Sequence, residues 1–354
     1  MSTTFGRLAG LPVEVDGYAL ERLERDVSSA FTRVSTVIRL SGGGEEGLGE
    51  DVTYDAEDHD RLQAAGAVHP LAGSHTLASF SELVGGLPLF GAPPVREASL
   101  LYRRWAFESA ALDLALRQAG RSLADVLERE PRPLTYVVSL RLGEPATFAP
   151  VRDRLDVYPS LRFKLDPTVS WTPELEAELA ATGAVDSLDL KGAYKGSVVD
   201  NPADPERYRR WAETFPDAWL EDPDLEAPGI DEVLRPHRDR ITWDGPIHAV
   251  ADIEALPFAP RMVNVKPSRF GPLHRLFAAY DYCEARGIAM YGGGEFELGP
   301  GRGHIQLLAS LFHPDGPNDV APGAFNDPEP PPGLPSSPLP VAASDLGFRW
   351  AAAS

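Results

Sequence analysis

Cysteine is almost missing from this sequence of 354 residues, and its scarcity limits where the protein can act. Cys283 is the single cysteine, so no internal disulfide can form and nothing favours secretion. It falls in a segment predicted to be helical, where a thiol packs as a small apolar side chain. No apolar run is long enough to span a bilayer, and the N-terminus lacks the basic-then-apolar pattern of a signal peptide. We therefore expect a cytoplasmic protein with no membrane partner.

Positive charge is also scarce. The 33 lysines and arginines face 53 aspartates and glutamates, and the formal net charge of -20 argues against a nucleic-acid partner. Lysine occurs only at positions 164, 191, 195 and 266. Arginine keeps its proton at any workable pH, whereas a desolvated lysine can be tuned to release one. The chain uses arginine where it needs only a cation, so its few lysines are candidates for proton transfer.

Short apolar runs that end in a charged residue recur through the middle of the chain. The terminal residues are Lys164, Asp189, Glu221, Asp244 and Lys266, with gaps of 25, 32, 23 and 22 residues. Each gap is about the length of one strand, one helix and two turns, which is a repeating βα unit. In a barrel of such units the carboxyl ends of all strands meet at one mouth. The spacing therefore predicts that these five side chains form one cluster.

The same patterns predict the domain organisation. A β-branched run at 31–40 followed by a glycine-rich turn indicates an antiparallel meander, and apolar side chains at helical spacing predict a long helix over 97–120. The stiff segment 131–133 marks a boundary, after which strands alternate with helices up to a last strand at 318–321. Residues 326–340 contain seven prolines and cannot form regular structure. We expect a first domain over 1–130, a (β/α)8 barrel over 131–325 and a tail over 326–354 that returns to the first domain.

Three carboxylates that converge at one mouth repel one another and need a cation. Asp189, Glu221 and Asp244 offer only oxygen donors, which favours Mg²⁺, with Mn²⁺ as a substitute. Lys164 and Lys266 lie on the second and sixth strands, on opposite sides of an eight-stranded barrel. This arrangement suggests that the metal binds a small carboxylate substrate while a lysine removes the α-proton and the ion stabilises the enediolate.

At this point the chain resembles the enolase superfamily, in the muconate-lactonising-enzyme subgroup, whose members combine a Lys or His base with Mg²⁺. The matching segments follow in order at barrel spacing: 107–115 with 120–123, the Lys-x-Lys strand at 162–164, the Asp-x-Asn-Gly strand at 189–194, the Glu-(Asp/Gln)-Pro strand at 219–223, and 263–271. The resemblance implies an acid/base pair of Lys164 and Lys266, and metal ligands at Asp189, Glu221 and Asp244. It also implies that residues 1–130 and the C-terminal tail form an α+β capping domain that closes over the barrel mouth, with the loops at 17–18 and 51–54 as candidates for substrate contact.

Some positions depart from the family pattern. Arg162 replaces the first lysine of Lys-x-Lys, so it can hold a carboxylate but cannot exchange a proton. Lys191 stands where the family usually has asparagine, and Gly245 where it often has glutamate. Gly293 and Gly294, after the seventh strand, can offer backbone NH groups to a substrate carboxylate. No histidine ends the seventh strand, which separates the chain from the mandelate-racemase type.

Several reactions fit this one site. The first is a dehydration like that of o-succinylbenzoate synthase, with Lys164 as the base and Lys266 as a cation that stabilises the intermediate. The alternatives are racemisation or epimerisation of an N-acyl amino acid or dipeptide, and cycloisomerisation of a muconate. A relative that binds a carboxylate without catalysis is a further alternative, because Arg162, Lys191 and Gly245 would then mark a decayed site. We expect a homo-oligomer.

Overall fold

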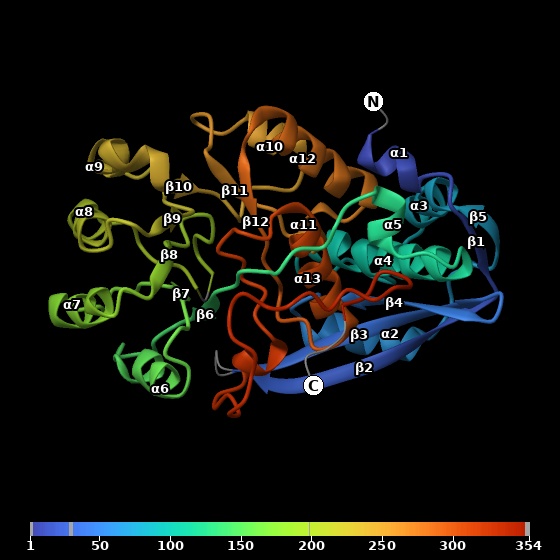
Figure 1. The fold of residues 1–354 in the computed structure, drawn as a ribbon, viewed down its shortest axis with the longest axis horizontal. Helices are drawn as coiled ribbons and strands as arrows, with labels where there is room; N and C mark the ends of the chain where they lie inside the picture. Colours follow the sequence, from blue (N-terminus) through green and yellow to red (C-terminus); the bar gives the residue numbers. More distant parts are fainter. Residues whose placement is uncertain (1–2, 28–30, 198, 351–354) are drawn as a thin grey trace.

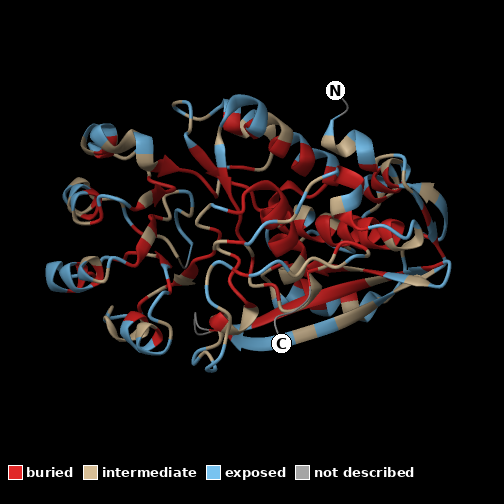
Figure 2. Cartoon of the chain, in the orientation of Figure 1, coloured by how far each residue is buried: buried red, intermediate tan, exposed pale blue. Residues whose placement is uncertain are grey.

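The computed structural model describes residues 3–27, 31–197 and 199–350, and its first part is a cap built on a three-stranded sheet. Strands β2 (Gly17–Val27), β3 (Phe31–Gly42) and β4 (Glu45–Asp51) pair antiparallel in sequence order, as the meander pattern predicts. Helix α4 (Ser99–Gln118) packs on this sheet (Figure 1), and Figure 2 shows how deeply it is buried. A β-carbon at Gly47 or Gly49 would lie within 2.2 Å of the α4 backbone, so glycine allows this close approach.

Shorter elements complete the cap. Strand β1 pairs antiparallel with β5, and helix α5 begins with a capping box between Ser122 and Asp125. The remaining bounds are α1 (Thr4–Leu8), β1 (Pro12–Val15), α2 (Ala56–Ala65), β5 (Gly73–Thr76), α3 (Leu77–Gly86) and α5 (Leu123–Leu127).

The second part is the (β/α)8 barrel. Five parallel strands pair in the order β10-β9-β8-β7-β6, and β11 pairs parallel with β12. Their bounds are β6 (Val138–Leu140), β7 (Phe163–Leu165), β8 (Val185–Asp189), β9 (Trp219–Glu221), β10 (Ile241–Thr242), β11 (Met262–Asn264) and β12 (Ala289–Tyr291).

The sheet does not run continuously around the barrel, and single backbone contacts complete the ring. Asn264 N donates to Trp243 O at 2.9 Å, which joins β11 to β10. The predicted last strand at 318–321 forms only isolated bridges, from Asn318 to Tyr136 and from Asp319 to Gly293. It therefore fills the eighth position between β12 and β6.

Helices cover the outside of the barrel, and α6–α9 line the left edge in Figure 1. Two of them begin with a side-chain cap and proline in the first turn: Thr172 precedes α7, and Asp204 precedes α8. The bounds are α6 (Ala149–Val157), α7 (Pro173–Ala181), α8 (Pro205–Thr214), α9 (Ile230–Leu234), η1 (Arg235–Arg240), α10 (Val250–Glu254), α11 (Pro267–Phe270), α12 (Leu273–Arg286), α13 (Pro300–Phe312) and η2 (Gly323–Asn326).

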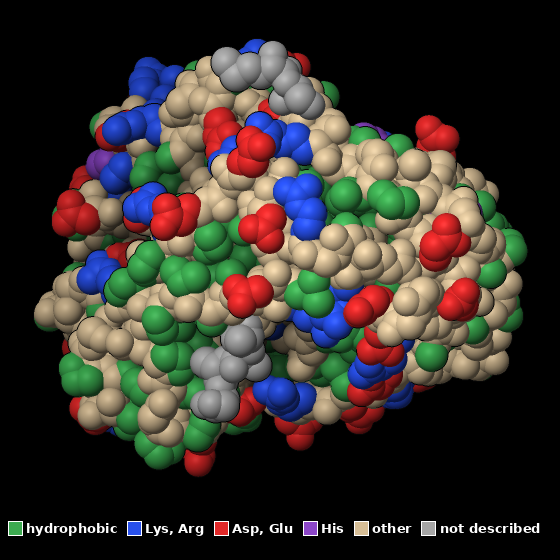
Figure 3. Space-filling view, turned by 45° about the vertical axis from the view of Figure 1, so that its right-hand side comes forward, with side chains coloured by type: hydrophobic (Ala, Val, Ile, Leu, Met, Phe, Trp, Pro, Cys, Tyr) green, Lys and Arg blue, Asp and Glu red, His purple; other side chains and the backbone are tan. Residues whose placement is uncertain are grey.

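The C-terminal tail contacts both parts. Phe348 is fully buried, edge-on to Trp105 of α4 and stacked on His304 of α13. Arg349 pairs with buried Asp113 at 2.7 Å. On the face drawn in Figure 3, acidic and basic side chains are interspersed. Among the described residues, no helix combines the length and the apolar character needed to cross a membrane.

Candidate active site

The structure brings together all five residues that end the apolar runs. Lys164 lies in β7, Asp189 and Glu221 end β8 and β9, and Asp244 and Lys266 lie two residues beyond β10 and β11. Parallel pairing sets Asp189 opposite Glu221, so the strands present them at the same end. Each of the five is at most 7% exposed. The cluster therefore lies inside the barrel mouth, away from bulk water.

One half of the cluster is built around Lys164. Its Nζ atom lies 3.1 Å from Asp189 Oδ2 and forms a second ion pair with Glu221 Oε1. The hydroxyl of Tyr291, at the end of β12, donates to the other Glu221 oxygen. Tyr291 was not among the predicted site residues, because an aromatic residue at the end of an apolar run looks like core. Glu221 is thereby held from two sides.

The other half is built around Lys266. Its Nζ atom lies 3.0 Å from Asp244 Oδ2, and Arg269 approaches the same oxygen at 3.3 Å. Glu295 contacts both of these cations, with Oε1 at 3.1 Å from Arg269 Nε and 3.7 Å from Lys266 Nζ. Tyr54 of the cap donates to Glu295 Oε2 at 2.7 Å. The cap loop at 51–54 therefore reaches the barrel mouth.

The two lysines face the cluster from opposite sides of the barrel. Strand β7, which carries Lys164, is separated from β11, which precedes Lys266, by β8, β9 and β10 in one direction. In the other direction β6, the 318–321 segment and β12 lie between them. A molecule held over the carboxylates would have one ammonium group on each side.

A group of three carboxylates is close enough to share a metal ion. Oxygen atoms of Asp189, Glu221 and Asp222 all lie within 4.8 Å of one another. Asp222 is an addition to the predicted ligands, and it has a left-handed backbone conformation, with φ of 49°. Its carboxylate accepts hydrogen bonds from the backbone N–H groups of Asp244 (2.9 Å) and Gly245 (2.7 Å). Asp222 directly follows Glu221, so the pattern of a charged residue at the end of a strand could also have predicted Asp222 as a ligand.

Asp244 stands apart from this group, although it was predicted to be a ligand. Its Oδ2 atom is taken by Lys266 and Arg269, whereas its buried Oδ1 atom has no hydrogen-bond partner among the described residues. A buried carboxylate oxygen without a hydrogen-bond partner costs free energy of folding. A cation bound to Asp244 Oδ1 would relieve this cost. Its role as a ligand stays a prediction.

The donor set fits a divalent cation. Burial raises the pKa of Glu221 well above its usual value and that of Asp222 to about 6. With an ion present and every carboxyl group ionised, the charged groups of the mouth would sum to two negative charges: Asp166, Asp189, Glu221, Asp222, Asp244 and Glu295 against Lys164, Lys191, Lys266 and Arg269. The donors of the three-carboxylate group are oxygens, which hard cations prefer. One divalent ion would therefore bring the mouth to neutrality.

The ionisation states follow from burial and from neighbouring charges. Burial lowers the pKa of Lys164, but Asp189 and Glu221 outweigh it and raise this pKa well above its usual value. In the same way Asp244 and Glu295 outweigh burial and raise the pKa of Lys266. Burial raises the pKa of Asp244, but Arg269 and Lys266 outweigh it and lower this pKa to about 2. Both lysines are therefore ammonium ions in this structure.

The structure does not bring Arg162 into the cluster. Its side chain is 45% exposed and pairs with Asp186, with Nε 2.7 Å from Oδ1. The pairing of β7 with β8 skips Asp186, because Phe163 lies opposite Val185 and Lys164 opposite Ser187. Arg162 therefore does not occupy the carboxylate-holding position that the resemblance to the Lys-x-Lys strand implied.

The glycines after β12 lie beside the cluster. A β-carbon at Gly293 would lie 2.6 Å from Lys266 Cε, and one at Gly294 would lie 2.3 Å from Glu297 Oε2. A side chain at Gly293 would therefore displace the lysine. That these glycines donate N–H groups to a substrate stays a prediction.

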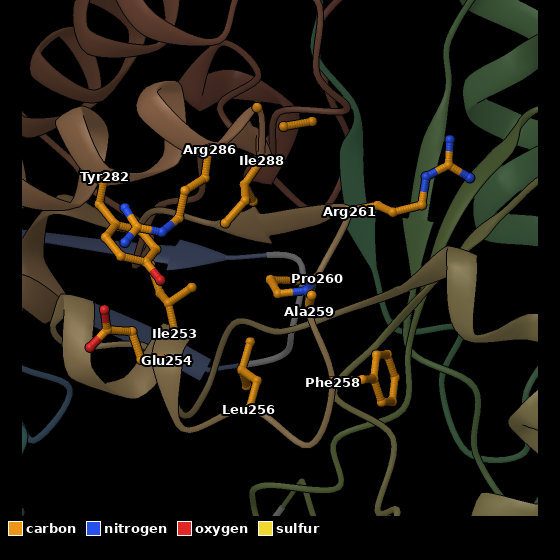
Figure 4. A pocket seen from close by; sticks show the side chains of 12 residues that line it. Ile253, Glu254, Leu256, Phe258, Ala259, Pro260, Arg261, Tyr282, Arg286 and Ile288 are labelled. Carbon is orange, nitrogen blue, oxygen red and sulfur yellow. The ribbon is translucent and has the colours of Figure 1, made fainter.

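A surface pocket lies away from this cluster. Its lining comes from the segment between α10 and β11 and from the end of α12, and it includes Leu256, Phe258, Arg261, Tyr282 and Arg286 (Figure 4). Its barrel residues precede or begin β11 and β12, so it opens at the amino ends of these strands. None of the cluster residues lines it.

Solved structures of other proteins, including a member of the enolase superfamily from Listeria innocua, share this capped barrel. A dipeptide epimerase from Enterococcus faecalis superposes with a TM-score of 0.67 at 15% identity, covering 95% of this chain and 99% of that one. A muconate cycloisomerase from Pseudomonas fluorescens gives a TM-score of 0.61 at 18% identity, with coverage of 96% and 95%.

Sequence comparison defines the family. Residues 6–126 and 130–327 match the N-terminal and C-terminal domains of the family described as a domain of unknown function, DUF8230, and the chain belongs to it. An N-succinylamino acid racemase from Thermus thermophilus is 28% identical over 310 residues, which cover 85% of this chain and 81% of the relative. A second, from an Amycolatopsis species, is 30% identical over 224 residues, with coverage of 62% and 58%. The prediction of a capped (β/α)8 barrel is confirmed, because the solved structures that superpose on this chain, an enolase-superfamily member among them, have the same fold.

Proposed function

We propose that this protein is a Mg²⁺-dependent racemase that inverts the α-carbon of an N-acylated amino acid. The observation that carries the proposal is the pair of buried ammonium groups, Lys164 and Lys266, on opposite sides of one carboxylate cluster. A racemase needs a proton donor on one face of the carbon and an acceptor on the other. The relatives that are N-succinylamino acid racemases support an N-acylated substrate.

Each residue has a task in this reaction. Asp189, Glu221 and Asp222 would hold the metal ion, with Asp244 beside them. Mg²⁺, when bound, would stabilise the negative charge that develops on the substrate carboxylate as the α-proton leaves.

The lysines and their neighbours supply the proton transfer. One lysine, as the free amine, takes the α-proton, and the other, as ammonium, returns a proton to the opposite face. Asp244 and Glu295 hold the Lys266 ammonium group in place. Tyr54, which reaches Glu295 from the cap, helps to exclude water from the reacting centre.

A dehydration like that of o-succinylbenzoate synthase is the second candidate. It would use Lys164 as the base and Lys266 only as a cation. Asp244 and Glu295 keep the amine of Lys266 protonated, as this reaction requires, but Asp189 and Glu221 raise the pKa of Lys164 in the same way. Both reactions begin with loss of the same α-proton, so the fate of that proton separates them.

Deuterium exchange tests the proposal. The full chain is incubated with Mg²⁺ in D₂O, with each enantiomer of N-succinyl and N-acetyl amino acids, and label at the α-carbon is followed by NMR. A racemase places deuterium in both enantiomers, whereas a dehydratase leaves them without interconversion and releases water from a succinylbenzoate precursor. Absence of ion-dependent exchange with every N-acyl amino acid would overturn the racemase assignment.

Single lysine variants sharpen the test. Lys164→Ala and Lys266→Ala should each abolish interconversion, and each should leave exchange of only the enantiomer whose proton faces the remaining lysine. Lys195→Ala is the matched control, because Lys195 is exposed and pairs with Asp224 away from the cluster. The two-lysine mechanism would be contradicted if Lys195→Ala lost as much interconversion as the other variants, or if both Lys164→Ala and Lys266→Ala still interconverted the enantiomers.

A further inference from the structure

Lys191 holds one of the carboxylates of the three-carboxylate group. Its Nζ atom lies 2.6 Å from Asp189 Oδ2, the same oxygen that Lys164 approaches at 3.1 Å. Its backbone N–H group donates to the other Asp189 oxygen at 3.3 Å. A left-handed backbone conformation, with φ of 57°, allows residue 191 to fold back on Asp189 in this way. Asp189 is therefore engaged on both oxygens before any ion arrives.

A second carboxylate, that of Asp166, lies close to the same ammonium group. Asp166 Oδ2 lies 3.3 Å from Lys191 Nζ. The other oxygen, Asp166 Oδ1, is buried and has no hydrogen-bond partner among the described residues. A short movement of the Lys191 side chain would release Asp189 and satisfy Asp166.

We propose that Lys191 is a mobile cation that competes with the divalent ion for Asp189 and moves to Asp166 when the ion binds. The inference rests on the proposed function in one respect, namely that a divalent ion binds at Asp189. Asp189 Oδ2 already contacts the Lys164 and Lys191 ammonium groups, so a divalent ion there would be a third positive centre. Positive charges a few ångströms apart in a site of low dielectric repel strongly. The ion must displace the ammonium group, so the chain binds it more weakly than it would with a neutral residue at 191.

This arrangement has a consequence for the protein without metal. The Lys191 ammonium compensates Asp189 while no ion is present, which lets the acidic mouth fold without metal. When the ion arrives, the positive charge is retained within the site and not released to solvent. Asp166 and Lys191 together therefore set the affinity for the ion without being ligands to it.

Calorimetric titration of the full chain with Mn²⁺ tests the proposal without reference to activity. Lys191→Asn should bind Mn²⁺ at least about tenfold more tightly than the wild type, because the competitor is gone. Asp166→Asn should bind it about tenfold more weakly, because the ammonium group loses its alternative partner. Lys195→Asn, which removes a lysine four residues away, should leave the affinity unchanged. Thermal melting without metal confirms that each variant is folded.

The double variant Lys191→Asn/Asp166→Asn shows whether Asp166 acts by receiving the Lys191 ammonium group or only through its own negative charge. If Asp166 acts only by receiving Lys191, then Asp166→Asn has little effect once Lys191 is gone. Equal weakening by Asp166→Asn in both backgrounds would overturn the movement to Asp166. Unchanged or weaker binding by Lys191→Asn, when the wild type binds Mn²⁺, would overturn the competition while leaving the proposed function standing. If the wild type and every variant fail to bind Mn²⁺, both proposals fail.

Discussion

His304 of α13 offers a quantitative test of how this protein responds to acid. Its imidazole is 1% exposed and stacks on Phe348 of the tail, with the ring centroids 4.2 Å apart. Neither ring nitrogen has a hydrogen-bond partner within the described ranges. Burial lowers the pKa of this histidine from 6.5 to about 4. A neutral imidazole is therefore enclosed where a charged one would be strongly disfavoured.

The sign of the pH effect follows from this pKa. As pH falls below 6.5, His304 of the unfolded chain takes up a proton, whereas the folded protein does not until pH approaches about 4. Stability is therefore lost as pH falls through this window, by about 2 kcal/mol at pH 5 and about 3 kcal/mol at the lower limit. His304→Met fills similar space without titrating. We expect it to gain about 1 kcal/mol at pH 7.5, where only the unpaired nitrogens are relieved.

Urea unfolding of the wild type and His304→Met from pH 7.5 to 5 measures this difference. The gap between the two proteins should widen by about 2 kcal/mol as pH falls. His313 provides the matched control, because burial also lowers its pKa to about 4, but its Nδ1 atom lies 2.7 Å from Asn318 Oδ1. His313→Met should flatten the pH dependence in the same way but lose about 1 kcal/mol at pH 7.5. Parallel loss of stability in the wild type and His304→Met would refute the reasoning.

Three further substitutions probe the mouth of the barrel. Gly245→Ala would place a β-carbon 3.0 Å from Asp222 Oδ2, so it should cost about 1–3 kcal/mol in urea unfolding and weaken Mn²⁺ binding in a calorimetric titration. Tyr54→Phe removes the hydrogen bond to buried Glu295 and should cost about 1.5–3 kcal/mol, measured by the same unfolding. Gly293→Ala should displace the neighbouring lysine and lower the turnover rate at least about tenfold in the racemisation assay, with thermal melting to show that the fold is kept.

The cluster could be predicted from sequence because its signal is local. A charged residue that ends a short apolar run, as Asp189 and Glu221 do, contradicts burial unless a site requires it. Parallel pairing then brings such ends together whatever the details of packing. The spacing of Lys164 and Lys266 along the chain fits the same βα repeat. This spacing therefore predicted both the barrel and the charged cluster at its mouth.

The remaining features depend on contacts that no local pattern encodes. Arg162 was expected to hold a carboxylate because it replaces the first lysine of the Lys-x-Lys strand, but its side chain is exposed and pairs with Asp186. Asp222 points into the cluster because backbone N–H groups beyond the next strand bind its carboxylate. Tyr54 reaches Glu295 across the interface between cap and barrel, over 241 residues of sequence. Such contacts can be predicted only when the register of the strands and the placement of the cap on the barrel are known.

The scarcity of lysine now has a physical explanation. Lys164, Lys191 and Lys266 all lie in the carboxylate cluster, and Lys195 is the remaining one. A guanidinium group spreads its charge over a rigid fork and keeps its proton, which suits the fixed pairs found elsewhere in the chain. A lysine ammonium group is compact, flexible and able to lose its proton, and the proposed reaction and the proposed movement of Lys191 would use these properties. Lys164 and Lys266 would exchange a proton with the substrate, and Lys191 would release Asp189 to the metal ion. Arginine is less suited to either task, because it keeps its proton and is rigid.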